Sequence, residues 1–426
     1  MQINPDIRFF VTTKRLLKLT GNAEVVCADG TYKLNWNSYP LIVVGTADKE
    51  RKNHPFGIGV SAKETMEDFA FMFQAIKMGA QEFHSIDFQP AYLMSDAAHA
   101  IGNGARATWP SIAIGMCWAH VATNLKKKLA IVGDKILAAK IKSDIYFLQT
   151  AVNEPEFNRL KGLLIQKWRN KSEGVDLFLD YFQREWLDKN CNWFEGFQES
   201  GISANNGLES NNRWIKEDFT FRERLPMNQF LPCLLRMVEA WSRDRLQGRH
   251  EWINDTTLVW KFGRKKLAIQ TDAYQWATIH RNSASVIATE HDCQWLVYSK
   301  TDYGTLAPNN FSESDLRRFL KLPRFANIPQ NAIAISHRVT ANIFTFSSYV
   351  ELVSKFRMVK VWSSGGEWNA SCYCRDYLQC QYCKHSLGSL YLLGKLQFER
   401  NVTCVPLGQK RRRGRPKQVG EALSHE

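Results

Sequence analysis

Apolar and polar positions along the first half of the chain predict short buried strands and one long helix. Continuous apolar runs bounded by turn residues predict strands at residues 25–28, 41–45, 56–60, 92–95 and 112–116. Between the third and fourth runs the apolar positions follow helical spacing. The pair Ser61 and Glu64 predicts a capping box for this helix, and Gly79 predicts its C-terminal cap. The pattern therefore predicts an α/β fold.

Further along, the period of the apolar positions changes. From about residue 121 to 200 they recur at helical intervals among lysines, which predicts an all-helical insertion. A second helical stretch covers about residues 206–244. The predicted organisation is a large first domain at residues 1–245, a connecting region of mixed pattern at 246–345, a small domain at 350–398 and a basic tail at 405–426.

Composition narrows the class of protein. A hydrophobic content of 44% is that of a globular chain, and no run of eighteen or more apolar residues predicts a transmembrane helix, so no membrane partner is expected. The N-terminus lacks the charged-then-apolar pattern of a signal peptide. The formal net charge of +14 predicts a polyanionic partner, most commonly nucleic acid.

Six of these charges lie in residues 410–417. The segment from Arg413 to Pro416, with Arg415 between them, resembles the core of an AT-hook, which lays arginines into the narrow minor groove of A·T-rich DNA. A nuclear localisation signal on a disordered tail is the alternative interpretation. Both predict a nuclear protein.

A cysteine–histidine cluster near the C-terminus predicts a zinc site. Cys372 and Cys374 form one half-site, and Cys383 and His385 follow after eight residues. Three thiolates and one imidazole suit a tetrahedral zinc ion, and a closed site of four ligands makes that zinc structural. Cys380 remains an alternative ligand, because Cys380 and Cys383 also have the spacing of a ligand pair. The pattern resembles the SWIM zinc finger. The other cysteines are scattered through mostly apolar surroundings, which favours a reducing, intracellular compartment.

Three acidic residues have positions suited to metal-dependent phosphoryl chemistry. Asp29 ends the first predicted strand, Asp96 ends the fourth, and Glu209 lies early in a helix. Together they could hold two Mg²⁺ ions roughly 4 Å apart for in-line attack at phosphorus. Taken singly, each is better explained as a solvated carboxylate or a helix cap. Asp48 and Asp87 are rival acids with less suitable positions.

The helix around Glu209 also carries candidate DNA contacts. Glu209, Arg213 and Lys216 share one face of the helix, because they are spaced at i, i+4 and i+7. Two further cations follow, at Arg222 and Arg224. This face suits a DNA backbone.

Several motifs in a fixed order carry a family resemblance. They are Asp29-Gly-Thr-Tyr32, Ser95-Asp96 followed by Ala100-Ile101 and Trp109-Pro110, Cys117-Trp-Ala-His120, and Asn205-Asn206-x-x-Glu209-Ser210 with Arg213 and Lys216. In this order they resemble the Mutator-like element (MULE) transposases. The resemblance covers about residues 13–226, and the SWIM-type cluster extends it to residues 359–396.

The resemblance implies an RNase H-like catalytic core with a helical insertion, which agrees with the predicted order of three strands, a helix and two strands. It implies a D-D-E site of Asp29, Asp96 and Glu209 that binds magnesium or manganese. It also implies that Cys117 and His120 lie close to that site. One Cys and one His cannot close a zinc site, so the alternative for this pair is a buried thiol and a hydrogen-bonded imidazole.

The implied function is Mg²⁺-dependent cleavage and transfer of DNA strands. Only 28 residues precede Asp29, so we expect the N-terminal DNA-binding domain of the family to be missing. The alternative functions are a transposase-derived, non-catalytic nuclear DNA-binding regulator and a zinc finger that binds protein partners. A homo-oligomer is compatible with each of these functions.

Overall fold

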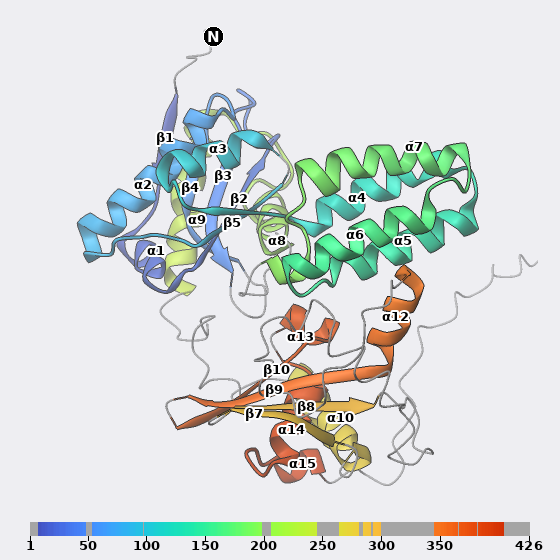
Figure 1. The fold of residues 1–426 in the computed structure, drawn as a ribbon. Coiled ribbons are helices and arrows are strands. Elements are labelled where there is room, and N and C mark those ends of the chain that lie inside the picture. Colours follow the sequence, from blue (N-terminus) through green and yellow to red (C-terminus); the bar gives the residue numbers. More distant parts are fainter. Residues whose placement is uncertain are drawn as a thin grey trace, which may run out of the picture.

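The computed structural model describes residues 7–47, 53–96, 98–197, 206–244, 264–280, 284–290, 293–299, 345–364, 366–380 and 382–403 (Figure 1). It shows a mixed sheet with its helices, a helical unit beside it, and a C-terminal sheet that carries the cysteine–histidine cluster. Among the described helices, none is both long and apolar enough to cross a membrane.

A six-stranded mixed sheet forms the first part of the molecule, in the order β1-β4-β3-β2-β5-β6. The strands are β1 (Arg8–Val11), β2 (Val25–Thr31), β3 (Leu41–Ala47), β4 (Asn53–Ser61), β5 (Tyr92–Ser95) and β6 (Ala113–Met116). Neighbours from β1 to β2 are antiparallel, whereas β2, β5 and β6 run parallel. All five predicted strands are present, and β1 is an additional edge strand that the apolar pattern did not reveal.

Helices cover this sheet. They are α1 (Lys14–Leu17), the 3₁₀ turn η1 (Lys18–Asn22), α2 (Met66–His84), α3 (His99–Thr108), α8 (Asn206–Trp214), its π-helical continuation η5 (Ile215–Phe219) and α9 (Met227–Asp244). Every residue of β3 and β4 is buried, so both faces of the sheet are covered. α9 packs against β1 and β4, and α8 packs against β2 and β4. Sheet and helices share one apolar core.

The start of α2 differs from the sequence prediction. The capping pair is Thr65 and Asp68, not Ser61 and Glu64: the Asp68 carboxylate accepts a hydrogen bond from the Thr65 backbone N–H at 2.8 Å. Ser61 still belongs to β4, where it pairs with Arg8, and its hydroxyl donates to Asp68 at 2.6 Å. The strand thus continues one residue beyond its apolar run, through Ser61, and the helix begins later, at Met66.

The end of α2 differs as well. Gly79 lies inside the helix, which continues to His84 and is capped by Ser85 in the left-handed region at φ 55°. A Cβ at Gly79 would lie 2.8 Å from Leu17 Cδ1. The glycine therefore permits α1 to approach α2, and it is not a helix stop.

The helical unit lies between β6 and α8 in the chain. Its elements are α4 (Trp118–Lys128), η2 (Leu129–Val132), α5 (Lys135–Gln149), α6 (Glu154–Trp168), α7 (Glu173–Phe182), η3 (Gln183–Lys189) and η4 (Glu195–Phe197). They enclose a second core, rich in phenylalanine and tryptophan. Side chains of Asp134, Asn153 and Ser172 cap α5, α6 and α7 by accepting backbone N–H groups.

The C-terminal unit is a four-stranded antiparallel sheet in the order β10-β9-β8-β7. Its elements are α10 (Arg264–His280), β7 (Ala284–Glu290), β8 (Cys293–Ser299), β9 (Phe356–Ser364), β10 (Glu367–Cys372), α13 (Arg375–Cys380), α14 (Lys384–Leu392) and α15 (Arg400–Thr403). α10 packs against α14. Described parts of the range predicted as a connecting region thus complete the sheet that carries the cysteine–histidine cluster.

One helix joins this unit to the helical unit. α12 (Phe346–Lys355) leads into β9 (Figure 1). Its Phe346 and Tyr349 belong to the core of the helical unit. The Tyr349 hydroxyl donates to the buried Glu156 carboxylate at 2.5 Å.

Candidate metal and nucleic-acid sites

The register of the central sheet brings Asp29 and Asp96 together. β2 and β5 are parallel, with Cys27 opposite Met94. Asp29 lies two residues after Cys27, within β2, and Asp96 lies two residues after Met94, directly after β5. Adjacent parallel strands are about 4.8 Å apart, so the two acids lie side by side at the same edge of the sheet. The Oδ1 atom of Asp96 accepts a hydrogen bond from the Ala98 backbone N–H at 2.9 Å.

Helix α8 brings a third group to Asp29. Leu208 and Ile215 are fully buried in the core and anchor α8 and η5 against the sheet. This anchoring directs Asn212 inward, where its side-chain amide donates to Asp29 Oδ2 at 2.8 Å. Asn212 Oδ1 is buried and has no hydrogen-bond partner among the residues that the structure describes. Position 209 lies on α8 one turn before Asn212, while its side chain is outside the described ones.

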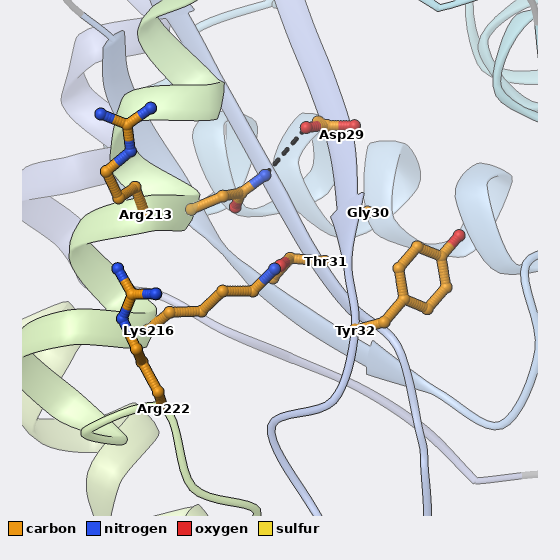
Figure 2. Close-up of a pocket in the computed structure, with 8 residues that line it drawn as sticks. Asp29, Gly30, Thr31, Tyr32, Arg213, Lys216 and Arg222 are labelled. Carbon is orange, nitrogen blue, oxygen red and sulfur yellow. Dashed lines mark hydrogen bonds between the residues drawn. The ribbon is translucent and has the colours of Figure 1, made fainter.

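A pocket of about 410 Å³ opens between β2 and α8 (Figure 2). Its lining residues are Asp29, Gly30, Thr31, Tyr32, Asn212, Arg213, Lys216 and Arg222. Figure 2 shows the three cations on the helical side, opposite the strand that carries Asp29, with Lys216 extended toward Thr31. The pocket therefore combines one carboxylate with three cationic side chains, of which Arg222 is ion-paired with Glu217, a composition suited to binding a phosphate group.

A further acid beside the pocket was missed by sequence reasoning, which assigned it to a helix cap. Glu64 accepts a hydrogen bond from the Tyr32 hydroxyl. A Cβ at Gly30 would lie only 2.1 Å from Glu64 Oε1, so the glycine leaves the space that the carboxylate fills. Burial and the nearby charge of Asp96 raise the pKa of Glu64, although the Tyr32 hydrogen bond opposes this. The sequence feature that could have indicated this acid is Gly30, directly after Asp29, because a glycine there leaves space for another side chain.

Cys117 and His120 lie at the same edge of the sheet. Cys117 is fully buried at the start of α4, and its backbone N–H donates to the Ser95 carbonyl at 2.9 Å, next to Asp96. Burial, followed by the charge of Cys117, raises the pKa of the neighbouring Cys27 to about 12. Cys117 and His120 belong to no group with metal-ligand spacing among the described residues. The backbone hydrogen bond of Cys117 thus places the start of α4 next to Asp96.

The four predicted zinc ligands converge. Cys372 ends β10, Cys374 precedes α13, and Cys383 and His385 begin α14. All four are buried, and their ligand atoms lie within 4.8 Å of one another. His385 Nδ1 is 3.6 Å from Cys383 Sγ and 3.8 Å from Cys372 Sγ. The donor set and its geometry therefore fit a tetrahedral zinc ion.

Backbone N–H groups hold two of the cysteine sulfurs in the cluster. Cys374 Sγ accepts the Tyr377 backbone N–H, and Cys383 Sγ accepts the Ser386 backbone N–H, each at 3.4 Å. Burial raises the pKa of Cys372 and Cys383, so a cation is needed to keep these buried thiols deprotonated. Cys380 ends α13, and its side chain is outside the described ones.

Helix α10 supports the imidazole of the cluster. The Trp276 ring meets the His385 ring edge-on at 5.3 Å, and a Cβ at Gly388 would lie 2.5 Å from Trp276 Cε3. Trp276 thus connects α10 to the cluster and fixes the orientation of the histidine. The predicted tail contacts, Arg413 and Arg415, lie outside the described residues.

Comparison with known proteins identifies the class of the first domain. Residues 25–124 match the family model described as the MULE transposase domain. This span includes Asp29, Asp96, Cys117 and His120, and it ends before Glu209. The protein therefore contains a MULE transposase domain over these residues, and its C-terminal cluster is compatible with a SWIM-type zinc finger. A search of curated proteins found no match.

Proposed function

We propose that this protein is a MULE-type DNA transposase, and that Asp29, Asp96 and Glu209 hold the divalent ions for strand cleavage and strand transfer. The parallel register of β2 and β5 carries this proposal, because it sets the two aspartates side by side. α8 packs against β2 through buried residues, which brings the helix that contains Glu209 to the same edge. The match over residues 25–124 supports DNA as the substrate.

The fold of the first domain supports an RNase H-like core. Three antiparallel strands, β4, β3 and β2, are followed in the sheet by the parallel strands β5 and β6. α2 makes the crossover between β4 and β5. The helical unit falls between β6 and α8, where the family resemblance places an insertion before the catalytic Glu.

The residues of the two candidate sites would have different roles. Asp29, Asp96 and Glu209 would hold magnesium or manganese, whose contribution would be activation of a water or a 3′-hydroxyl and stabilisation of the leaving oxygen. Asn212 holds the orientation of Asp29 through its 2.8 Å hydrogen bond. Arg213, Lys216 and Arg222 would bind the phosphates that flank the scissile bond. Zinc at the Cys₃His cluster would be structural, and the finger would engage DNA or a protein partner in the nucleus.

Cleavage and joining of labelled DNA duplexes in Mg²⁺ or Mn²⁺ test this function. We expect Asp96→Asn to lose activity about a hundredfold or more, because metal-bound charge in the transition state depends on that carboxylate. Asp87→Asn is the control: Asp87 is exposed and bonded to Gln89, on the segment that precedes β5. A wild-type rate in Asp96→Asn would refute the metal-site assignment. Salt-sensitive DNA binding without any cleavage would support the non-catalytic regulator instead.

A further inference from the structure

Two exposed aromatic side chains lie close in the chain to residues that line the pocket: Trp36 follows Tyr32 by four residues, and Phe221 precedes Arg222. Trp36 is 68% exposed and Phe221 is 76% exposed, the highest values for aromatic residues among the described side chains. Large aromatic rings are normally buried for most of their surface, so such exposure on an ordered loop suggests a binding role.

The loops that carry these two rings are joined to each other. Asn35 and Leu225 form a parallel β-bridge. The Trp36 backbone N–H donates to the Leu225 carbonyl at 3.0 Å, and the Leu225 N–H donates to the Leu34 carbonyl at 2.9 Å. The loop after β2 and the loop after η5 are therefore joined, and each adjoins residues that line the pocket, Tyr32 in one case and Arg222 in the other.

The loop that carries Trp36 is firmly held. Asn35 is fully buried, and its side chain bonds both the backbone carbonyl and the backbone N–H of Tyr39, at 2.8 and 2.9 Å. Leu34, on the other side of Asn35, is 1% exposed. Trp36 thus projects from a loop whose neighbouring residue is anchored in the core. Its exposure does not arise from a loose segment.

Phe221 projects from a strained turn. Phe221 and Arg222 have φ angles of 50° and 62°, in the left-handed region that non-glycine residues rarely adopt. The Arg222 backbone N–H returns to the Lys216 carbonyl, and the Arg222 side chain enters the pocket. The same turn therefore carries a cation that lines the pocket and, next to it in the chain, an exposed aromatic ring.

We propose that Trp36 and Phe221 form a stacking platform for unpaired DNA bases, while Arg213, Lys216 and Arg222 bind the backbone of that strand. Aromatic rings interleaved with cations are the surface that single-stranded nucleic acid uses, because every base offers a stacking face and every phosphate a charge. The cations favour nucleic acid over an apolar protein segment. This proposal rests on the proposed function, since it names the form of DNA that the same site accepts.

DNA-binding measurements without catalysis test the platform. Fluorescence anisotropy would compare a labelled single strand with a duplex of equal length for the wild type, Trp36→Ala, Phe221→Ala and Trp36→Phe. We expect each alanine variant to bind the single strand about tenfold more weakly and the duplex nearly as the wild type does. Trp36→Phe keeps a stacking ring and should remain close to the wild type. Met78→Ala is the control, because Met78 is 69% exposed on α2 and lies outside the pocket lining.

Salt titration separates the two kinds of contact. Lys216→Ala should lower the dependence of affinity on salt, whereas Trp36→Ala should leave it unchanged. Unchanged single-strand affinity in both alanine variants, with wild-type melting temperatures, would overturn the platform alone. Equal losses on single strand and duplex, or a changed oligomeric state with unchanged DNA affinity, would also overturn it. Absence of any DNA binding by the wild type would overturn the proposed function as well.

Discussion

Removal of one ligand from the cysteine–histidine cluster should release zinc and unfold only the C-terminal unit. With a Zn–S bond of about 2.3 Å and a Zn–N bond of about 2.0–2.1 Å, a tetrahedral site has S···N edges of about 3.5 Å. The two measured S···N distances, 3.6 and 3.8 Å, are close to this value. The folded chain therefore already has nearly the geometry that the ion requires.

The magnitude of the effect follows from the burial of the ligands. Cys372, Cys374 and Cys383 belong to the small core that also contains Trp276. Structural zinc contributes apparent free energies of about 10–16 kcal/mol, comparable with the whole stability of a domain of about 5–15 kcal/mol. Loss of the ion should therefore unfold this core, while the core of the mixed sheet contains none of the ligands and should persist.

The assay measures zinc per chain together with thermal unfolding. We expect one zinc in the wild type, a strong loss of zinc in Cys374→Ser, and an early partial transition in the melting curve of that variant. Cys191→Ser, a half-buried cysteine outside the cluster, should keep the metal. Cys380→Ser tests the alternative ligand pair and should also keep it. Stoichiometric zinc in Cys374→Ser, or no zinc in the wild type, would refute the site.

Two further predictions concern stability. Gly196→Ala should destabilise the helical unit by about 3 kcal/mol, because the new Cβ would lie 1.9 Å from the Val152 carbonyl carbon. Gly162→Ala, whose new Cβ would have no atom within 4 Å, should stabilise the same unit by about 0.5–1 kcal/mol. Thermal melts compare the two variants, and equal effects would refute the packing argument. Burial alone would raise the pKa of Asp68, but the hydrogen bonds that its carboxylate accepts, including the one from Arg8, lower this pKa in the folded protein. The stability that Asp68 contributes is therefore present above its unfolded pKa of about 3.9, and it is lost as the pH falls through the lowered folded pKa. Asp68→Asn should reduce the free energy of unfolding near pH 7 by about 2 kcal/mol and flatten its decline in acid, as measured by urea titration at several pH values.

The sequence predicts the strands of the first sheet well because they are buried on both faces. Continuous apolar runs at residues 25–28 and 41–45 need no partner to be recognised. β1 is missed since it is a short edge strand whose identity depends on pairing with β4. The start of α2 is misplaced because two plausible capping pairs lie four residues apart, and only the extent of β4 decides between them.

The candidate sites likewise include residues that can be predicted from local sequence and residues that depend on tertiary contacts. Ligands close in sequence, such as Cys383 and His385, reveal their chemistry through spacing alone. Asn212 reaches Asp29 only because α8 packs against the sheet, and Glu64 lies beside the pocket only because Gly30 leaves space for its carboxylate. Both are tertiary contacts. The two joined loops that carry Trp36 and Phe221 have the same origin, since the bridge between Asn35 and Leu225 joins positions far apart in the chain.

Binding of Mn²⁺ at the D-D-E site tests the central claim most directly. Electron paramagnetic resonance would count the Mn²⁺ ions bound in the presence of uncleaved DNA by the wild type, Asp29→Asn, Asp96→Asn and Glu209→Gln, with Asp87→Asn as the control. We predict about two ions in the wild type and in the control, and at least one fewer, or much weaker binding, in each of the other three variants. Wild-type Mn²⁺ binding in Asp29→Asn and Asp96→Asn would contradict the assignment of these acids as the catalytic metal site.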